Sequence, residues 1–370
     1  MRLATFNVEN MFERAKAMNL DNWDEGKNVL EDFQRLNTLI QQETYNAATK
    51  DELLTIMKRH RGLISNGVSK FIRFRDIRGK FLYRPKNKPA EIAADGRADW
   101  IGWFELEKEA VKESATENTA RVIGLLQTDI ICVVEAENRI GLKRFNEDVL
   151  AKLQVAPFQH IMLIDGNDDR GIDVGIMTRD GFNITCMQSH VDDADADGII
   201  FSRDCPEYEI TTPRGNKLLL LINHLKSKGF GSPADSNAKR TRQTKQLRKI
   251  YDAKRASYDF IALLGDFNEN PDFAPMDALL REGSDLTDIM THAKFVGDGR
   301  PGTFGNGTAS GKLDYILMSP KLAEKVLQGG IERRGVWGGV NGTLFPHLPT
   351  IKSAKDAASD HAALWAELDI

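Results

Sequence analysis

The sequence has 370 residues, of which 41% are hydrophobic and 28% charged, and its formal net charge is −4. This length suffices for a large core in one or two domains, and the composition is typical of a soluble globular protein. The small negative charge excludes a protein that coats nucleic acid through bulk charge, but it is compatible with a local basic patch. Cys132, Cys186 and Cys205 are odd in number and widely spaced, which excludes a disulfide framework and a cysteine metal knuckle.

The N-terminal stretch MRLATFNVENMF lacks a basic region followed by a long apolar run. We therefore expect neither a signal peptide nor a membrane span. Cytoplasmic location is the default expectation, and a secreted mature form is the alternative. No feature of the sequence predicts a protein partner.

Short segments rich in branched and aromatic residues recur along the chain at about the mean length of a strand. They are RLATFNV, DIICVVE, FQHIMLI, DVGIMT, KLLLLINHL, DFIALLGDF, LDYILM and HAALWAEL. Consecutive apolar positions in several of them predict strands covered on both faces. Helical periodicity lies between them, most clearly at residues 117–127 and 238–254. We expect an α/β fold with paired sheets flanked by helices, because these strands are too many for one simple parallel sheet.

Residues 20–116 differ from the rest of the chain. Apolar residues recur there at helical spacing, namely Leu30, Phe33, Leu36, Leu39 and Ile40. A charged helical stretch and the strand-like KFLYRPKN follow. We interpret residues 1–370 as a single domain in which residues 20–116 form a helix-rich insertion packed on the main domain. Long insertions beside active sites often shape substrate choice.

Polar side chains lie at one end of several predicted strands. Four strands end in polar groups, which are Asn7, Glu135, His224, and the pair Asp266 and Asn268. Other strands begin with polar groups, which are Asp173, Asp314, and the pair Asp360 and His361. In a mixed sheet the ends of some strands lie beside the starts of their antiparallel neighbours. We therefore expect all of these groups to converge on one rim.

The carboxylates in this set have the chemistry of a metal site. Glu135 and Asp360 are hard oxygen ligands of the kind that Mg²⁺ or Mn²⁺ takes, and these ions need only one or two carboxylates. Asp266 can polarise an attacking water, and Asn268 can hold that water or a phosphate oxygen. These residue types therefore predict metal-assisted hydrolysis.

The histidines complete the set. His361 and His224 can stabilise charge that develops on a phosphoryl group, or donate a proton. Each histidine needs a carboxylate to fix its tautomer, and Asp314 and Asp173 are available for this. The simplest role for Asp173 is to orient His224. Together these groups are the parts needed to hydrolyse a phosphate ester.

The order of these motifs resembles the endonuclease/exonuclease/phosphatase superfamily. Its members include pancreatic deoxyribonuclease, abasic-site endonucleases, neutral sphingomyelinases and inositol polyphosphate 5-phosphatases. The resemblance rests on TFNVEN, the strand end at Glu135, NHLKSK, GDFN, LDYIL and SDH, and it covers residues 1–12 and about 117–370. It implies a four-layer α/β sandwich, in which two mixed β-sheets pack face to face with helices outside.

The resemblance also implies roles for individual residues. The family residue that matches Asp266 activates or orients the attacking water. The residues that match Glu135 and Asp360 bind the metal, and Asn7 helps to place it.

In the same family, the residue that matches His361 contacts the scissile phosphate and is paired with the residue that matches Asp314. His224 matches a second phosphate-contacting histidine of some branches. Two features depart from the pattern. The usual glutamine before the metal-binding glutamate is Val134 here, and the insertion at residues 20–116 has no counterpart in the common family core.

Basic and aromatic side chains outside these motifs are candidate substrate contacts, namely Arg170, Lys226, Lys228, Arg333 and Trp337. Arg170 lies three residues before Asp173, and Lys226 and Lys228 lie two and four residues after His224. Arg333 and Trp337 suit a phosphate and a stacked base, or a phospholipid headgroup. The basic segment 239–249 is either a solvated helix face or one wall of a groove for a polyanion.

An acidic segment at residues 193–204 follows the spacing of a calcium loop, with Asp193, Asp195, Asp197 and Gly198 in order and Asp204 at the closing position. Such a loop normally ends in a bidentate glutamate and lies between helices. This segment follows a strand-like run instead. A solvated acidic loop is the better interpretation.

We therefore predict a Mg²⁺- or Mn²⁺-dependent phosphodiesterase, foremost a nuclease that hydrolyses DNA or RNA through in-line attack of water. Its partner is then a nucleic-acid substrate. The alternative is a phosphatase or phosphodiesterase for a small-molecule or lipid phosphoester, because the rim loops decide function on such a fold. A binding protein that has lost the chemistry is disfavoured, since it would be expected to lack some of these site residues.

Overall fold

The computed structural model describes residues 1–20, 23–228, 232–281 and 283–370. The chain divides into two compact units. Unit 1 contains Met1–Phe12, Val111–Lys228 and Ser232–Ile370, and unit 2 contains Glu13–Ala110. Each unit is described by itself below.

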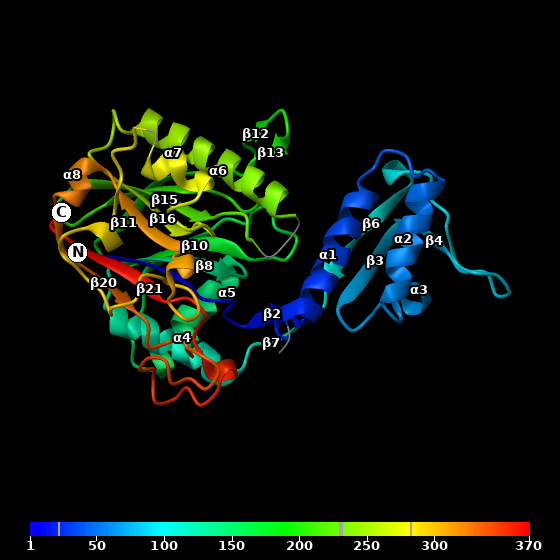
Figure 1. The fold of residues 1–370 in the computed structure, drawn as a ribbon, viewed down its shortest axis with the longest axis horizontal. Helices are drawn as coiled ribbons and strands as arrows, with labels where there is room; N and C mark the ends of the chain where they lie inside the picture. Colours follow the sequence, from blue (N-terminus) through cyan, green and yellow to red (C-terminus); the bar gives the residue numbers. More distant parts are fainter. Residues whose placement is uncertain (21–22, 229–231, 282) are drawn as a thin grey trace. The chain divides into compact units, whose positions relative to one another are not determined.

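Unit 1 is built on two large mixed sheets (Figure 1). The first sheet has the order β18 (Phe295–Val296), β20 (Val326–Glu332), β21 (Ala363–Leu368), β1 (Arg2–Asn7), β8 (Ile130–Ala136), β10 (Asp173–Thr178) and β9 (His160–Leu163). The second has the order β11 (Asn183–Gln188), β14 (Glu207–Thr211), β15 (Lys217–His224), β16 (Phe260–Asp266), β19 (Asp314–Met318) and β17 (Thr287–Asp288). A small hairpin, β12 (Ala194–Asp195) and β13 (Gly198–Ile199), lies outside both sheets.

Alternate residues of the central strands build three separate cores. In β8, Cys132 and Val134 belong to the core between the two sheets, whereas Ile131 and Val133 pack with helix residues on the other face. The same alternation in β15 sends Leu220 to the inner core and Leu219 and Leu221 to the outer one. Both faces of each sheet are therefore buried, which explains the consecutive apolar residues in these strands.

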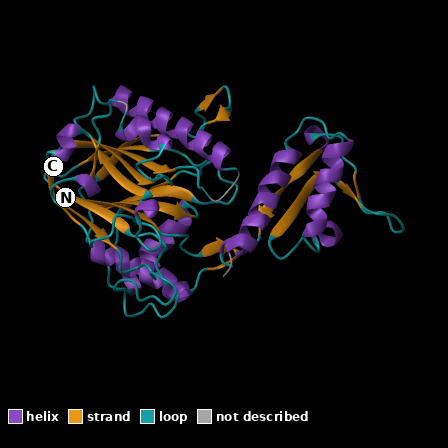
Figure 2. Cartoon of the chain, viewed as in Figure 1, coloured by secondary structure: helices purple, strands orange, loops and turns teal. Residues whose placement is uncertain are grey.

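Helices cover the outer faces. Helix α4 (Glu113–Leu126) packs on the first sheet, and α6 (Pro233–Lys254) packs on the second. Shorter helices are α5 (Arg139–Arg144), α7 (Asp277–Leu280) and α8 (Pro320–Ala323). Figure 2 shows helix, sheet, sheet and helix in sequence across unit 1. This is the four-layer α/β sandwich that the sequence predicted.

Unit 2 contains helices and strands around a core of its own. Its elements are β2 (Glu13–Ala15), α1 (Trp23–Ile40), α2 (Ala47–Arg59), α3 (Leu63–Asn66), β3 (Ile72–Gly79), β4 (Leu82–Tyr83), β5 (Glu91–Ile92), β6 (Trp100–Leu106) and β7 (Lys108–Ala110). Strands β2 and β7 pair antiparallel where the segment leaves and rejoins unit 1. Apolar residues of α1, α2, β3 and β6 share one core.

Unit 2 differs in two respects from the insertion expected at residues 20–116. It runs from Glu13 to Ala110, and it contains a paired sheet as well as helices. The aromatic core formed by Phe74, Phe81, Trp100 and Phe104 explains its compactness, because these rings pack on one another. The expected packing of this segment on the main domain stays a prediction.

The strand register aligns the polar strand ends. In the second sheet His224 is opposite Asp266, and Asp266 is opposite Asp314. In the first sheet Asn7, at the end of β1, pairs with Val134, one residue before Glu135. The ends of parallel strands thus meet the starts of antiparallel ones, as the sequence predicted.

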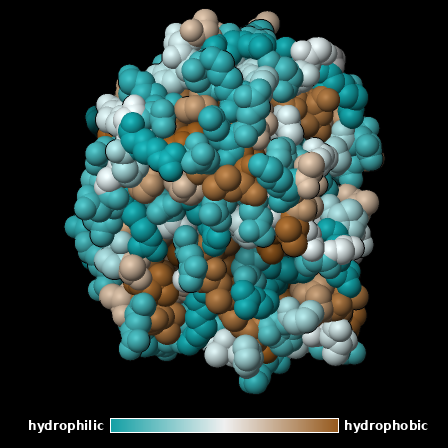
Figure 3. Space-filling view, turned by 90° about the vertical axis from the view of Figure 1, so that its left-hand side faces the viewer, coloured by the Kyte–Doolittle hydropathy of each residue, from teal (hydrophilic) through white to brown (hydrophobic). Residues whose placement is uncertain are grey.

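Hydrophilic side chains predominate on the surface of unit 1 that Figure 3 shows. Figure 3 shows the face on which the two termini lie, and its hydrophobic side chains form small patches between hydrophilic ones. Within the described part of the chain, no helix combines the length and the apolar character needed to cross a bilayer.

Candidate active site

The rim of unit 1 carries unusual backbone conformations. Among the described residues six non-glycine residues have positive φ, and four of them lie there, namely Glu9, Asn10, Glu135 and Asn268. Such conformations are uncommon and cluster at functional sites. At Glu135 the cause is a β-bulge, because Asp173 pairs with Ala136 and Val174 with Val134, so Glu135 has no partner on β10. A bulge of this kind turns a side chain out of the regular alternation.

Asp266 is buried at the centre of this rim. Its Oδ1 accepts the backbone N–H of Asn268 (2.8 Å), and its Oδ2 accepts from the side-chain amides of Asn268 and Asn7 (3.2 Å each). Burial raises the pKa of Asp266 to about 7, against the lowering effect of the charge on His361. Gly265 precedes it with φ 126°, and a Cβ there would lie 2.0 Å from the carbonyl oxygen of Asn223. Glycine is therefore required where the strand delivers Asp266.

His361 is fixed by Asp314. Its Nδ1 donates to Asp314 Oδ2 (2.8 Å), and Thr303 Oγ1 donates to the same oxygen (2.6 Å). Nε2 of His361 lies 3.8 Å from both Asp266 Oδ2 and Asp360 Oδ1. Burial lowers the pKa of His361, but the charges of Asp314, Asp266 and Asp360 outweigh this and raise it well above its usual value. His361 is therefore an imidazolium at neutral pH, with its free N–H directed into the site.

His224 lies on the other side of Asp266 and is also buried. Its Nε2 is 3.6 Å from Glu135 Oε1 and 3.8 Å from Asp266 Oδ2. Burial and the neighbouring charges of Arg203 and Arg170 lower its pKa well below the usual value. The site therefore holds one charged and one neutral histidine.

Asp173 was expected to orient His224, and the structure corrects this expectation. Asp173 accepts the backbone N–H of Gly166 (2.8 Å), and Nδ1 of His224 is buried without a hydrogen-bond partner. The bulge at Glu135 and the local loop explain this, because Asp173 satisfies its own loop instead of reaching β15. Burial raises the pKa of Asp173 to about 7.

Glu135 and Asp360 offer carboxylate oxygens of the kind that could hold a hard cation. The side chain of Glu135 is 14% exposed and that of Asp360 is 42% exposed, so both remain reachable from solvent. Asn7 Nδ2 donates to Glu135 Oε1 (3.2 Å), and its Oδ1 accepts the backbone N–H of Glu9 (3.0 Å). Carboxylates with some access to water fit a hydrated Mg²⁺ or Mn²⁺. Asn7 thus holds the carboxylates of Glu135 and Asp266 in position.

A second group of ligand-type atoms has a different explanation. Oxygens of Asp266 and Asp314 and a nitrogen of His361 lie within 4.8 Å of one another. Asp314 Oδ2 already accepts from His361 and Thr303. A hydrogen-bonded acid–histidine pair accounts for this group better than a cation does.

A cationic wall lies beside His224. Asp168 accepts two hydrogen bonds from Arg170 (2.9 and 2.7 Å), and Arg203 Nε lies 2.7 Å from the same carboxylate. Burial would raise the pKa of Asp168, but both arginines hold it well below its usual range. Burial and these arginines lower the pKa of Lys226 to about 8. The guanidinium groups of Arg170 and Arg203 and the ammonium group of Lys226 place positive charge beside His224, which favours a bound anion.

Lys228 occupies a different environment from Lys226. Its Nζ lies 2.5 Å from Glu269 Oε1, and Arg240 of α6 lies 3.0 Å from Glu269 Oε2. Glu269 follows Asn268 directly, so this buried network anchors the end of β16 to α6. Arg242 and Arg248 of the same helix pair with Asp195 and Asp252. These arginines of the segment 239–249 thus serve the fold.

The contacts of Arg333 and Trp337 are with residues other than the polar side chains of the rim. Arg333 is buried, pairs with Asp298 and donates to the carbonyl oxygen of Gly302 (2.6 Å). Trp337 stacks on His347 with ring centroids 5.3 Å apart. Substrate contact by these two residues stays a prediction.

The acidic segment 193–204 uses its carboxylates within the protein. Asp193 Oδ2 lies 3.0 Å from Nδ1 of His190, and Asp195 accepts from Arg242 (2.8 Å). Asp204 accepts the backbone N–H of His190 (2.7 Å). These carboxylates have different partners, which favours the acidic-loop interpretation over a calcium site.

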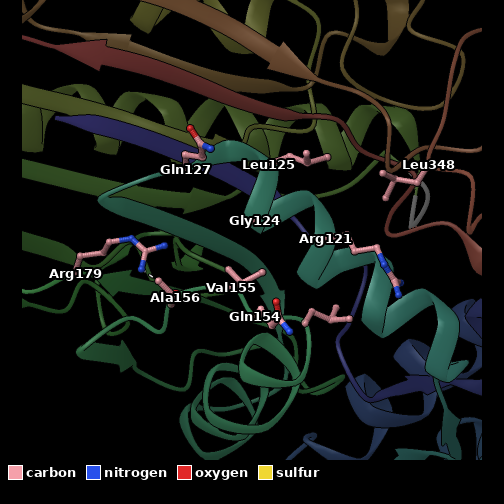
Figure 4. A pocket seen from close by; sticks show the side chains of 10 residues that line it. Arg121, Gly124, Leu125, Gln127, Gln154, Val155, Ala156, Arg179 and Leu348 are labelled. Atoms are coloured by element: carbon pink, nitrogen blue, oxygen red, sulfur yellow. Dashed lines mark hydrogen bonds between the residues drawn. The ribbon is translucent and has the colours of Figure 1, made fainter.

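A pocket of about 570 Å³ lies beside α4 (Figure 4). Arg179 at its edge donates to the carbonyl oxygens of Thr128 and Ala156 (2.8 Å each). Arg121 pairs with Glu117 (3.1 Å). The lining residues include no carboxylate or histidine, so this pocket lacks catalytic groups.

Several residues of the site were missed from the sequence. Thr303 carries no motif and reaches Asp314 through a loop, while Ser359 Oγ donates to the carbonyl oxygen of Asn7 (2.7 Å). Glu9 Oε2 accepts the backbone N–H of Asp360 (3.1 Å). Arg203 lies in the stretch SRDC, just before a strand. The polar residues around it were the one sequence signal that could have pointed to a role in the site.

Comparisons with known proteins agree with this geometry. The model of the Endonuclease/Exonuclease/phosphatase family matches residues 89–296, which are 208 of the 370 residues. A search of curated proteins found no match.

Two similar solved structures come from Bacteroides thetaiotaomicron. A mannosyl-6-phosphatase is 18% identical, with a TM-score of 0.50 over 70% of this chain and 92% of that one. An endonuclease/exonuclease/phosphatase family protein is 17% identical, with a TM-score of 0.50 over 70% and 90%. At such identities the likeness concerns the fold alone. By its family match, its fold and its ordered motifs, the chain belongs to the endonuclease/exonuclease/phosphatase family.

Proposed function

We propose that this protein is a divalent-metal-dependent phosphodiesterase whose substrate is a nucleic acid. Its family consists of phosphoester hydrolases that generally depend on a divalent metal. The observation that carries the proposal is the buried Asp266, whose Oδ2 lies 3.8 Å from Nε2 of both His224 and His361, with the carboxylates of Glu135 and Asp360 beside these histidines. Such a set combines a base, an acid and oxygen ligands around one point.

The chain's own residues supply most of the chemistry. Asp266, held by Asn268 and Asn7, accepts the proton of the attacking water, and a pKa of about 7 suits a base near neutral pH. His361, held by Asp314, presents its N–H to a phosphoryl oxygen as negative charge develops there. His224 lines the opposite side. Arg170, Arg203 and Lys226 provide positive charge for the phosphate.

Glu135 and Asp360 would hold a Mg²⁺ or Mn²⁺, which supplies charge neutralisation for the phosphate and the leaving oxygen when bound. Asn7 keeps Glu135 and Asp266 in place.

The test uses purified protein with Mg²⁺ or Mn²⁺ and three substrates: supercoiled plasmid, a single-stranded oligonucleotide and bis-p-nitrophenyl phosphate. EDTA and Asp266→Asn serve as controls. Metal-dependent cleavage of a nucleic acid that both controls abolish is the expected result. Hydrolysis of the small diester alone would keep the mechanism but reject the nucleic-acid substrate. Turnover of phosphomonoesters alone would favour a phosphatase, the class to which the Bacteroides thetaiotaomicron mannosyl-6-phosphatase belongs by name.

A further inference from the structure

Unit 2 carries a local concentration of positive charge. Residues 70–88 contain eight basic residues and one acidic residue, for a net charge of +7, namely Lys70, Arg73, Arg75, Arg78, Lys80, Arg84, Lys86 and Lys88 against Asp76. The whole chain has a net charge of −4, so the remaining residues carry −11. A charge this concentrated creates a strong local field although the protein as a whole is acidic.

The strand register places three of these arginines on the open face of the β3–β6 sheet. Phe74 and Phe104 are cross-strand partners and belong to the core of unit 2. Arg75 is opposite Trp103 and Arg78 is opposite Ile101, so these pairs lie on the other face. Arg73, opposite Glu105, lies there too.

An aromatic side chain accompanies each group of cations, with Trp103 opposite Arg75 in the sheet and Tyr83 beside Lys80 in the segment after β3. Trp103 is 44% exposed and Tyr83 is 42% exposed, so each ring presents part of its surface to solvent while the rest packs on the protein. Lys80 Nζ lies 5.1 Å from the Tyr83 ring. Half-exposed rings flanked by cations are the components of a surface on which bases stack and phosphates pair.

The charges on this surface are only partly neutralised. Arg73 and Arg75 pair with Glu107 and Glu105 (2.6 and 2.7 Å). Among the residues that the structure describes, Arg78, Lys86 and Lys88 form no ion pair, and all three are exposed. This contrasts with the arginines of α6, which pair with Glu269, Asp195 and Asp252. The surface of unit 2 therefore carries cationic side chains that are not paired with carboxylates.

We propose that the open face of the β3–β6 sheet and the segment 80–88 that follows β3, together called the basic face, bind a single strand of nucleic acid. Phosphates would pair with Arg75, Arg78 and the lysines of the following loop, and bases would stack on Trp103 and Tyr83. An anionic bilayer is the less suitable partner, because both rings lie half-buried in the surface and Glu105 interrupts the cations. The choice of partner rests on the proposed function, whereas the docking surface goes beyond it.

The experiment measures binding of a labelled single-stranded oligonucleotide to the full chain by fluorescence anisotropy in EDTA, so that no cleavage occurs. The test variant is Arg78→Glu with Lys88→Glu. The matched control is Lys245→Glu with Lys249→Glu, which makes the same charge change at two exposed lysines of α6. We expect the Kd to rise about 10-fold or more in the test variant and less than about 3-fold in the control. The slope of log Kd against log salt should fall by about 1.5 in the test variant, because two phosphate contacts are lost.

Three further variants extend the test, and the first of them lies outside strands β3 and β6. Lys86→Glu with Lys88→Glu changes only the loop after the sheet and should also weaken binding about 10-fold. Trp103→Ala should weaken it about 10-fold, and Trp103→Phe should restore most of the loss through stacking. Equal losses in the α6 control, or unchanged binding in all basic-face variants, would overturn the proposal. Binding to phosphatidylserine vesicles but not to the oligonucleotide would overturn it in favour of a membrane.

The same preparations separate this inference from the proposed function. Hydrolysis of bis-p-nitrophenyl phosphate reports on the active site and does not use the basic face. Weakened oligonucleotide binding in a protein that turns over no phosphoester would support the basic face and reject the enzyme. Turnover with binding that ignores the basic face would do the reverse.

Discussion

Charged side chains behave in opposite ways at the rim of unit 1 and on the basic face of unit 2. At the rim, Asp266, Asp314 and His361 are buried and hold one another in fixed positions. On the basic face, Arg78 and Lys88 are exposed. Catalysis needs groups whose geometry and pKa are set in advance, whereas docking of a flexible polyanion needs reachable charge. The difference fits the proposed division of labour between chemistry at the rim and substrate capture on the basic face.

The largest expected effect is on the rim. Asp266→Asn removes the proton acceptor but keeps the size of the side chain, so kcat for bis-p-nitrophenyl phosphate should fall about 10³-fold. Steady-state kinetics with saturating Mg²⁺ measure this. Oligonucleotide binding in EDTA should stay within about 2-fold of wild type, because the basic face is untouched. A parallel loss of binding would break the comparison.

Matched arginine substitutions test where charge supports the fold. Arg240→Met leaves the buried Glu269 with Lys228 alone, and we expect a loss of about 3 kcal/mol in the free energy of unfolding. Arg78→Met on the basic face should cost less than about 0.5 kcal/mol. Urea denaturation of both variants provides the numbers. Equal losses would show that the basic face is structural.

The next effect concerns the orientation of His361. Asp314→Asn weakens the hydrogen bond that fixes the ring and removes the charge that stabilises the imidazolium. We expect kcat to fall about 10²-fold with little change in KM. The acidic form of His361 should also be lost at a lower pH than in wild type, which a pH–rate profile detects. An unchanged profile with lower kcat would indicate a purely structural role.

The smallest effect is a pH dependence of stability at His190. Burial lowers its pKa, but the hydrogen bonds and charges of Glu207 and Asp193 outweigh this and raise it. A raised folded-state pKa contributes stability that is complete below the unfolded value of about 6.5 and is lost as the pH rises through the folded value. The Tm of wild type should exceed that of His190→Gln by about 3 °C at pH 6. The difference in Tm should shrink at pH 9. A difference that stays constant would rule out the charge of His190 as its cause.

The convergence of the polar strand ends could be predicted from the sequence because strand ends obey simple geometry. Asn7, His224 and Asp266 are the last residues of their strands and Asp314 is the first of its strand, so register brings His224, Asp266 and Asp314 together. Glu135 lies one residue before a strand end, and His361 lies two residues before a strand start. The failure at Asp173 has a physical reason. A bulge and a local loop hydrogen bond redirect that carboxylate, and neither is visible in the order of residues.

Loop-borne and helix-borne contacts were harder to predict. Thr303 reaches Asp314 only through the folding of its loop, so no motif announces it. The sequence left Arg240 either on a solvated helix face or on one wall of a groove for a polyanion, but the chain buries it against Glu269. A basic helix face thus proved to be partly an anchor, while the +7 charge of residues 70–88 was available in the sequence as a simple local count.

The most direct test of the division of labour compares two substrates on two variants in Mg²⁺. Asp266→Asn and Arg78→Glu with Lys88→Glu are each assayed on bis-p-nitrophenyl phosphate and on a single-stranded oligonucleotide below its KM. The account predicts that Asp266→Asn loses both activities. The basic-face variant should keep the small diester and lose about 10-fold in kcat/KM on the oligonucleotide. Equal effects of the basic-face variant on both substrates, or an oligonucleotide that the wild-type protein leaves intact, would contradict it.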